Sequence, residues 1–140
     1  MENKIAGQIA EFLNNYNKLD KFFQKNEILK DFKNYQYLID GAKDLIGAVK
    51  LIKFDWYLGG IKHLTVKDSL RRQGYGVKLL EMAEKDALDQ NIRVLQATIR
   101  KNDLASINCF NRRGYKEVNC FFNKRTNRNI LIFQKILSLC

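Results

Sequence analysis

The sequence contains no proline, no low-complexity tract and no internal repeat within its 140 residues. These absences leave nothing that would mark a linker or a second domain. A chain of this length can bury a hydrophobic core without disulfide bonds or metal ions to staple it. We therefore expect a single globular domain that spans residues 1–140.

Long hydrophobic runs are also missing. No segment approaches the roughly 18 uncharged apolar residues that a membrane-spanning helix needs. Glu2, Lys4 and Glu11 interrupt the N-terminal segment, which excludes the apolar centre of a secretory signal peptide. The chain is therefore expected to stay in the cytoplasm, without a membrane partner.

Histidine occurs once, as His63, and the three cysteines, Cys109, Cys120 and Cys140, do not form a CxxC motif. One histidine and three scattered cysteines do not make the ligand spacing of a structural zinc site. We expect free thiols and no bound metal.

Positive charge is abundant and unevenly distributed. The net charge of +10 divides into +1 for residues 1–60, +2 for residues 61–99 and +7 for residues 100–140. A basic surface attracts phosphates, nucleic acid or acidic partners through long-range electrostatics. The alternative is a solvated face that only keeps the protein soluble, and the charge alone leaves both open.

Hydrophobic periodicity predicts two helices at the N-terminus, over residues 3–16 and 19–32, where Leu19 and its apolar neighbours recur at helical spacing. Alternating patterns then predict a hairpin over residues 35–53, with GAKD as its turn, and a third strand that ends near Val66.

The second half of the chain is predicted to alternate between helices and strands. A helix follows Gly76 and runs to about residue 90, and a strand covers residues 93–100. A short helix then starts at Asn102 or Asp103 and ends before Gly114, a typical residue after a helix C-terminus. A basic hairpin closes the chain, with strands over residues 115–123 and 129–137 joined by KRTNR.

The segment between the third strand and its following helix is rich in glycine and arginine: residues 70–76 read LRRQGYG. The first turn of a helix presents unpaired N–H groups and the positive end of the helix dipole, so it binds anions. A Walker loop is excluded because Val77 follows Gly76, and a dinucleotide fingerprint is excluded because Leu79 replaces its third glycine. The alternative is a glycine-rich loop whose arginines are merely solvated.

Two sequence motifs, one on each side of the strand predicted at residues 93–100, resemble the signatures of the GNAT N-acetyltransferases. Arg71-x-x-Gly74-x-Gly76, preceded by HLTV and followed by an amphipathic helix, is similar to that family's acetyl-CoA signature. The segment NDLASINCFNRRGY, residues 102–115, resembles its second signature. The resemblance covers about residues 35–138.

This resemblance implies an α+β fold with a mixed, mostly antiparallel sheet that is splayed at the acetyl-CoA strand and flanked by helices. The family usually begins with a strand, but MENKIAGQIAEF shows no alternation. The first strand is therefore either absent or supplied by another part of the fold.

The resemblance also assigns cofactor contacts to individual positions. The strand before the loop would offer its backbone to the pantetheine amides, and the loop would hold the pyrophosphate. Asn102 and the next helix would line the rest. The assigned residues are Leu64, Thr65, Val66, Arg71, Arg72, Gln73, Gly74, Tyr75, Gly76, Asn102, Ser106 and Asn108. For Asn102 we expect a dual role, as helix cap and as cofactor contact. The alternatives are that Asn102 is only a helix cap and that Ser106 and Asn108 are exposed polar residues.

The residues for proton transfer depart from the family pattern. Many relatives place a tyrosine acid where this chain has Phe110, which cannot donate a proton. The usual base is also missing from the strand positions. His63 is the side chain whose ordinary pKa suits proton transfer near neutrality, but simple alternation places it on the face opposite Lys62 and Leu64. It is then a structural residue unless a bulge rotates the strand.

Three functions remain open at this point. The first is an acetyl-CoA-dependent N-acetyltransferase that acts on a primary amine of a small molecule or protein, including an acidic or nucleic-acid-associated target. The second is a module that binds coenzyme A without turnover. The third is a nucleic-acid-binding protein that uses basic residues of the last third, namely Arg112, Arg113, Lys116, Lys124, Arg125 and Arg128. Whether the chain forms a homodimer stays open.

Overall fold

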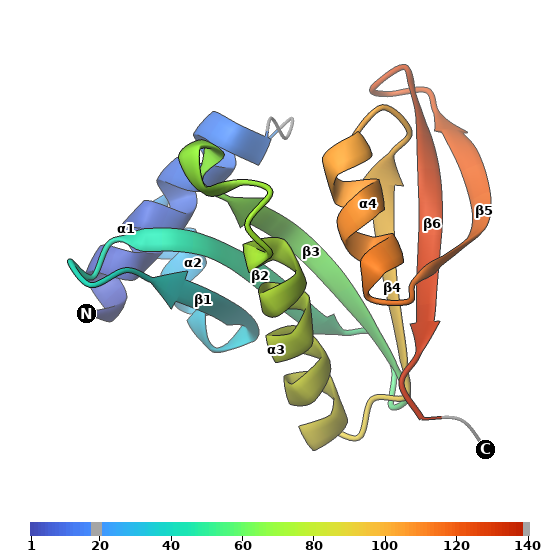
Figure 1. The fold of residues 1–140 in the computed structure, drawn as a ribbon, viewed down its shortest axis with the longest axis horizontal. Coiled ribbons are helices and arrows are strands. Elements are labelled where there is room, and N and C mark those ends of the chain that lie inside the picture. Colours follow the sequence, from blue (N-terminus) through green and yellow to red (C-terminus); the bar gives the residue numbers. More distant parts are fainter. Residues whose placement is uncertain (18–20, 139–140) are drawn as a thin grey trace.

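The computed structural model describes residues 1–17 and 21–138, in which six strands form one sheet flanked by helices (Figure 1). The order across the sheet is β1-β2-β3-β4-β6-β5. The strands are β1 (Tyr35–Ile39), β2 (Leu45–Lys53), β3 (Leu58–Val66), β4 (Val94–Arg100), β5 (Lys116–Asn123) and β6 (Arg128–Ile136). The α-helices are α1 (Glu2–Phe12), α2 (Lys25–Lys30), α3 (Tyr75–Asp89) and α4 (Leu104–Arg112).

The sheet is mixed, and its one parallel junction is short. β3 and β4 pair in parallel at Leu58↔Val94, Gly59↔Leu95 and Gly60↔Gln96, and beyond Gly60 they are no longer paired. All other neighbouring strands in the described chain are antiparallel. Figure 1 shows the two strands meeting at one end and separating toward the other. This confirms the α+β fold and the splayed strand pair expected from the sequence.

Helices cover both faces of the sheet (Figure 1). α3 and α4 pack on one face in a core that includes Leu80, Leu95 and Phe110. α1 and α2 pack on the other face over β1 and β2, where Ile5, Ile9 and Tyr35 are buried. Within the described residues, no helix is both long and apolar enough to cross a membrane.

The prediction of a second helix over residues 19–32 is wrong at its start and confirmed in its second half, where α2 covers Lys25–Lys30. The first predicted helix is present as α1, which continues into a π-helical turn, Leu13–Asn17. The chain is not helical over residues 21–24, and α2 begins only at Lys25; Leu19 lies outside the described residues. The Asn14 side chain bonds both the N–H and the C=O of Phe23, at 2.8 and 2.9 Å. These bonds hold Phe23 outside a helical hydrogen-bond ladder.

The remaining predicted elements are present with small shifts of their bounds. No strand is found among the described residues before Tyr35, so the sheet begins with the hairpin. Gly114 follows α4 with φ +84°, the left-handed conformation expected after a helix C-terminus. Cys109 and Cys120 are free thiols, and Cys140 lies outside the described residues. No group of potential metal ligands occurs in the part of the chain that is described.

A buried ion cluster joins α3 to the far half of the sheet. The Glu84 carboxylate accepts hydrogen bonds from Arg113 Nη2 (2.6 Å), Lys135 Nζ (2.8 Å) and Tyr115 Oη (3.2 Å). Its side chain is only 7% exposed. Burial opposes ionisation of Glu84, but the hydrogen bonds from Arg113 and Lys135 outweigh it and hold its pKa below the ordinary value. Glu84 therefore fixes α3 against α4 and β6 as an ionised group.

We predict that Glu84→Ala destabilises the protein by about 2 kcal/mol, because it leaves two cations and a buried hydroxyl without their acceptor. Glu81→Ala is the matched control, since Glu81 contacts the same Arg113 at 3.5 Å from an exposed position and should change stability by under about 0.5 kcal/mol. Urea unfolding measures both. Equal effects of the two substitutions would contradict the role given to Glu84.

Candidate active site

A cavity of about 420 Å³ lies where β3 and β4 separate. One wall is β3 from Ile61 to Leu64, and the opposite wall is β4 from Ala97 to Arg100. α4 contributes Phe110 and residues of its N-terminal turn, and the β5–β6 connection forms a third side of the cavity. The residues from these last two segments are Asp103, Ser106, Phe110, Asn123, Arg125, Thr126, Arg128 and Ile130. The cavity is large enough for a small-molecule site.

A β-bulge in β3 corrects the expected orientation of His63. Ala48 pairs with Thr65 and Lys50 pairs with Lys62, so β3 carries one extra residue against β2. His63 absorbs it with φ +58°. Its Nδ1 lies 3.1 Å from the Tyr35 hydroxyl, and Tyr35 is the cross-strand partner of Lys50. His63 therefore lies on the same face as Lys62, whereas simple alternation placed it on the opposite face.

The surroundings of His63 keep it uncharged at neutral pH. Burial is the main cause, and the nearby Lys50, Lys62 and Lys21 add to it; together they lower the pKa of His63 to about 4. The Phe23 ring packs edge-on against the imidazole, with centroids 5.0 Å apart. Burial likewise raises the pKa of Tyr35, so its hydroxyl keeps its proton. His63 lines the cavity, and Nε2 is the ring nitrogen that Tyr35 does not engage.

The three residues of β3 assigned to the cofactor have different surroundings. Leu64 lines the cavity and packs against the core on the α3 side. Thr65 is 5% exposed, and its hydroxyl donates to the His63 carbonyl at 3.2 Å. Val66 pairs with Gly47 at the end of β3. The last part of β3 therefore runs from the cavity, at Leu64, to the loop before α3, which follows Val66.

The loop before α3 presents a helix N-terminus. Gly74 caps α3 with φ +85°, a conformation that disfavours side chains with a Cβ. The first hydrogen bond of the helix joins Lys78 N to Gly74 O, so the N–H groups of the preceding turn have no partner within the helix. Arg71 is paired with Asp68 at 3.1 Å, while Arg72 is exposed. The cavity wall, as far as the chain is described, does not include residues 70–76.

Gly76 has a packing role that sequence reasoning did not assign. A Cβ built at this position would lie 2.9 Å from Cys109 Sγ, which is closer than real Cβ contacts allow. The glycine therefore lets the first turn of α3 approach α4. Burial raises the pKa of Cys109 to about 11, which keeps it a protonated thiol. The structure favours a packing role for Cys109 over a reactive one.

Asp103, and not Asn102, caps α4. Its carboxylate accepts from Ser106 N at 3.2 Å and from Ser106 Oγ at 2.8 Å, which is typical of an N-cap residue. Asn102 is exposed and lines a separate hollow of about 260 Å³ beside Arg128. Ser106 lies on the cavity, whereas Asn108 is exposed and absent from its wall. The expected capping role of Asn102 is therefore wrong.

Comparisons with known proteins agree with this geometry. The profile of the acetyltransferase (GNAT) family matches residues 7–115. The chain belongs to this GNAT acetyltransferase family. A search of curated proteins finds no significant match.

Solved structures share the fold at low sequence identity. Ard1 from Thermoplasma volcanium is 15% identical, with 98% of this chain and 94% of that chain covered and a TM-score of 0.82. The yncA protein from Salmonella typhimurium, solved with its cofactor acetyl-CoA, is 15% identical over 98% and 89% of the two chains, with a TM-score of 0.79. The ribosomal-protein-S18-alanine N-acetyltransferase from Escherichia coli is 13% identical over 96% and 89%, with a TM-score of 0.76.

Sequence reasoning missed the contact of Tyr35 with His63 and the contribution of the β5–β6 connection to the cavity. The hairpin register around the GAKD turn pairs Tyr35 with Lys50, so the hairpin pattern contained part of the signal. No local pattern indicated that Arg125 and Thr126 would reach the cavity. Phe110 does line the cavity, and it is packed edge-on against Tyr115 with centroids 4.9 Å apart.

We predict that His63 makes the stability of this protein sensitive to pH. Because its folded pKa of about 4 is below its ordinary value of 6.5, its neutral form stabilises the fold fully above pH 6.5. This contribution is lost as the pH falls toward 4, and it amounts to about 3 kcal/mol at most. His63→Gln lacks the titrating group. Urea unfolding at several pH values should therefore show a smaller acid loss for the variant, and parallel losses would contradict the assignment.

Proposed function

We propose that the protein is an N-acetyltransferase that transfers the acetyl group of acetyl-CoA to a primary amine. The observation that carries the proposal is the cavity between two separating strands, one of which leads directly to an open helix N-terminus. The GNAT family membership supports the acetyltransferase part. The names of the structural neighbours, which include an alanine N-acetyltransferase and an acetyl-CoA complex, support the amine and the cofactor.

The residues at the helix N-terminus fit the pyrophosphate of coenzyme A. A Cβ at Gly74 would meet nothing within 4 Å, so the backbone is open at the point where an anion would approach. The N–H groups of Tyr75, Gly76 and Val77 lie at the positive end of a 15-residue helix. We propose that residues 71–76 hold the pyrophosphate and that β3 holds the pantetheine arm through its backbone.

Acetyl-CoA, when bound, supplies an activated acetyl group as a thioester. The side chains around the cavity contribute position and proton transfer. His63 can accept a proton at Nε2 when Nδ1–H donates to Tyr35 Oη, the bond whose length is 3.1 Å. With a pKa of about 4 it is a weak base, so we propose that the amine loses its first proton to solvent and that His63 accepts the second through a hydrogen bond.

This assignment changes the expected pH dependence. With its ordinary pKa of 6.5, His63 as the base would give a rate that rises with pH through that value. With the His63 pKa at about 4, His63 is already neutral near pH 6. The rate should instead follow the deprotonation of the acceptor amine, and it should rise toward alkaline pH with the pKa of whichever amine is used.

We predict that acetyl-CoA at about 100 times its dissociation constant stabilises the protein by about 2.7 kcal/mol. Gly74→Val should abolish this shift, because valine is strained at φ +85° and distorts the loop. Gly41→Val is the matched control: its Cβ also meets nothing within 4 Å, but its backbone is not in the left-handed region. Thermal unfolding with and without acetyl-CoA measures the shift. No change in the melting temperature of the wild-type protein on addition of millimolar acetyl-CoA would refute the cofactor assignment.

We predict acetyl-CoA-dependent mass gain on a primary amine, together with release of the free thiol of coenzyme A. His63→Gln should lower kcat by roughly 100-fold, because it removes the proton acceptor, with acetyl-CoA binding unchanged. Acetyl-CoA binding without thiol release from any amine would favour the non-catalytic module. A salt-dependent gel shift with RNA, without any acetyl transfer, would favour the hypothesis of a nucleic-acid-binding protein.

A further inference from the structure

The wall of the cavity is strongly cationic. Four of its side chains are basic, namely Lys62, Arg100, Arg125 and Arg128, and one is a carboxylate, Asp103. Asp103 is already engaged, because both of its oxygens accept hydrogen bonds from Ser106 at the start of α4. An anionic group that entered the cavity would therefore meet a positive wall without a competing acid.

Arg125, in the β5–β6 connection, and Arg128, the first residue of β6, form no ion pair within the described residues. No carboxylate of the described chain forms an ion pair with Arg125 or Arg128, whereas Arg113 is held by Glu84. Between them, the hydroxyl of Thr126 is buried and is the one buried side-chain polar atom of the described residues without a hydrogen bond. A buried hydroxyl without a hydrogen bond destabilises the fold. It lines the same cavity and offers a bond to a ligand.

This cationic wall is separate from the proposed pyrophosphate site. Residues 71–76 precede α3 at the end of β3, whereas Arg125 and Arg128 enter the cavity from the side of β4 and β6. Figure 1 shows the β5–β6 turn at the end of the sheet half that carries α4, across the splay from the start of α3. The two groups of cations therefore serve different parts of the bound reactants.

We propose that the acceptor is an amine that carries a carboxylate close to the reacting nitrogen, such as the N-terminus of an acidic peptide or an acidic amino compound. This inference rests on the proposed acetyltransferase function. Arg125 and Arg128 bind the carboxylate, and the Thr126 hydroxyl donates a hydrogen bond to it. Guanidinium groups suit this role because their donors match the two oxygens of a carboxylate.

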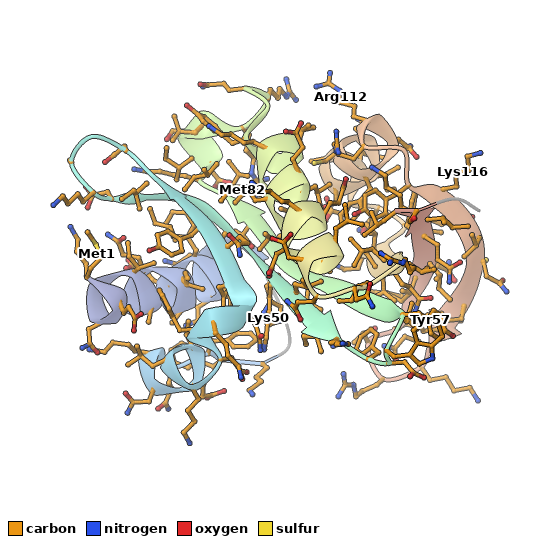
Figure 2. The ribbon with its side chains drawn as sticks, turned by 90° about the horizontal axis from the view of Figure 1, so that it is seen from below. Met1, Lys50, Tyr57, Met82, Arg112 and Lys116 are labelled. Atoms are coloured by element: carbon orange, nitrogen blue, oxygen red, sulfur yellow. The ribbon has the colours of Figure 1, made fainter. Side chains whose placement is uncertain are left out.

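The arrangement favours a carboxylate in the cavity over a nucleic-acid backbone on the surface. The basic residues predicted for nucleic-acid binding do not act together: Arg113 is held by Glu84, and Arg125 and Arg128 line the cavity. Arg112 and Lys116 point outward from the edge of the molecule (Figure 2). Three of the six residues are therefore held by Glu84 or placed at the cavity.

The test compares three peptides that differ only in their first two residues, which are glutamate, glutamine or lysine, and adds free glutamate and glutamine as small acceptors. We expect kcat/KM to be at least tenfold higher for the acidic peptide than for the neutral one, and lowest for the basic one. The KM of the acidic peptide should rise with salt, because screening weakens the attraction. Comparison with free glutamate shows whether the acceptor is a peptide or a small molecule.

The variants locate the effect. Arg125→Gln combined with Arg128→Gln should raise the KM of the acidic peptide about tenfold, with kcat and acetyl-CoA affinity unchanged. Lys124→Gln is the matched control, because Lys124 lies in the same turn but not on the cavity wall, and it should leave KM unchanged. Arg128→Glu should reverse the preference between acidic and basic peptides. Thermal unfolding confirms that each variant is folded.

The outcomes separate this inference from the proposed function. Acetylation of all three peptides at equal efficiency would overturn the charge preference and leave the acetyltransferase function intact. Failure to acetylate any amine, with acetyl-CoA bound, would overturn both. A loss of acetyl-CoA affinity in the double variant, with the acceptor KM unchanged, would assign the arginines to a phosphate of the cofactor. An RNA that competes with the acidic peptide only in the presence of Arg125 and Arg128 would assign them to a nucleic acid.

Discussion

The short parallel pairing between β3 and β4 is the constraint on which the site depends. Three residue pairs hold the strands together, and beyond Gly60 they separate. A sheet that stayed paired would fill this space with its own hydrogen bonds and leave no cavity. Because backbone groups at such an opening keep their hydrogen-bonding capacity, the splay produces both the space for a ligand and the polar strand edge beside it.

The separation requires support from outside the sheet, because neither half is bonded to the other beyond the junction. α3 and α4 provide it on one face. Gly76 allows them to approach at Cys109, and Glu84 ties α3 to Arg113 and Lys135 on the far half. The buried ion cluster is costly to desolvate, and its geometry specifies one relative position of the helix and the sheet. The opening of the cavity therefore depends on contacts that α3 makes with α4 and β6.

The site also shows how a local irregularity changes chemistry. The bulge in β3 moves His63 to the face of Lys62 and into contact with Tyr35 and Phe23. The same enclosure lowers the pKa of His63, so the residue gains a defined orientation and loses basicity. On the other wall, the β5–β6 turn concentrates arginines and a buried hydroxyl. One wall is thus suited to proton transfer from a neutral amine and the other to an anionic group.

The sequence by itself determined most of the elements, the glycine-rich turn before α3 and the family, because periodicity, helix-terminal residues and motif spacing are local properties of the chain. Two features were decided only by the tertiary structure. Asn14 bonds Phe23 and so keeps it out of the predicted second helix, and the bulge requires the register of β2 against β3. The cationic wall of the cavity was also decided by the tertiary structure, because Lys62 and Arg125 are far apart in sequence and line one cavity only in the folded chain. Long-range pairing leaves no periodic trace in a single sequence, and therefore these contacts could not be predicted from it.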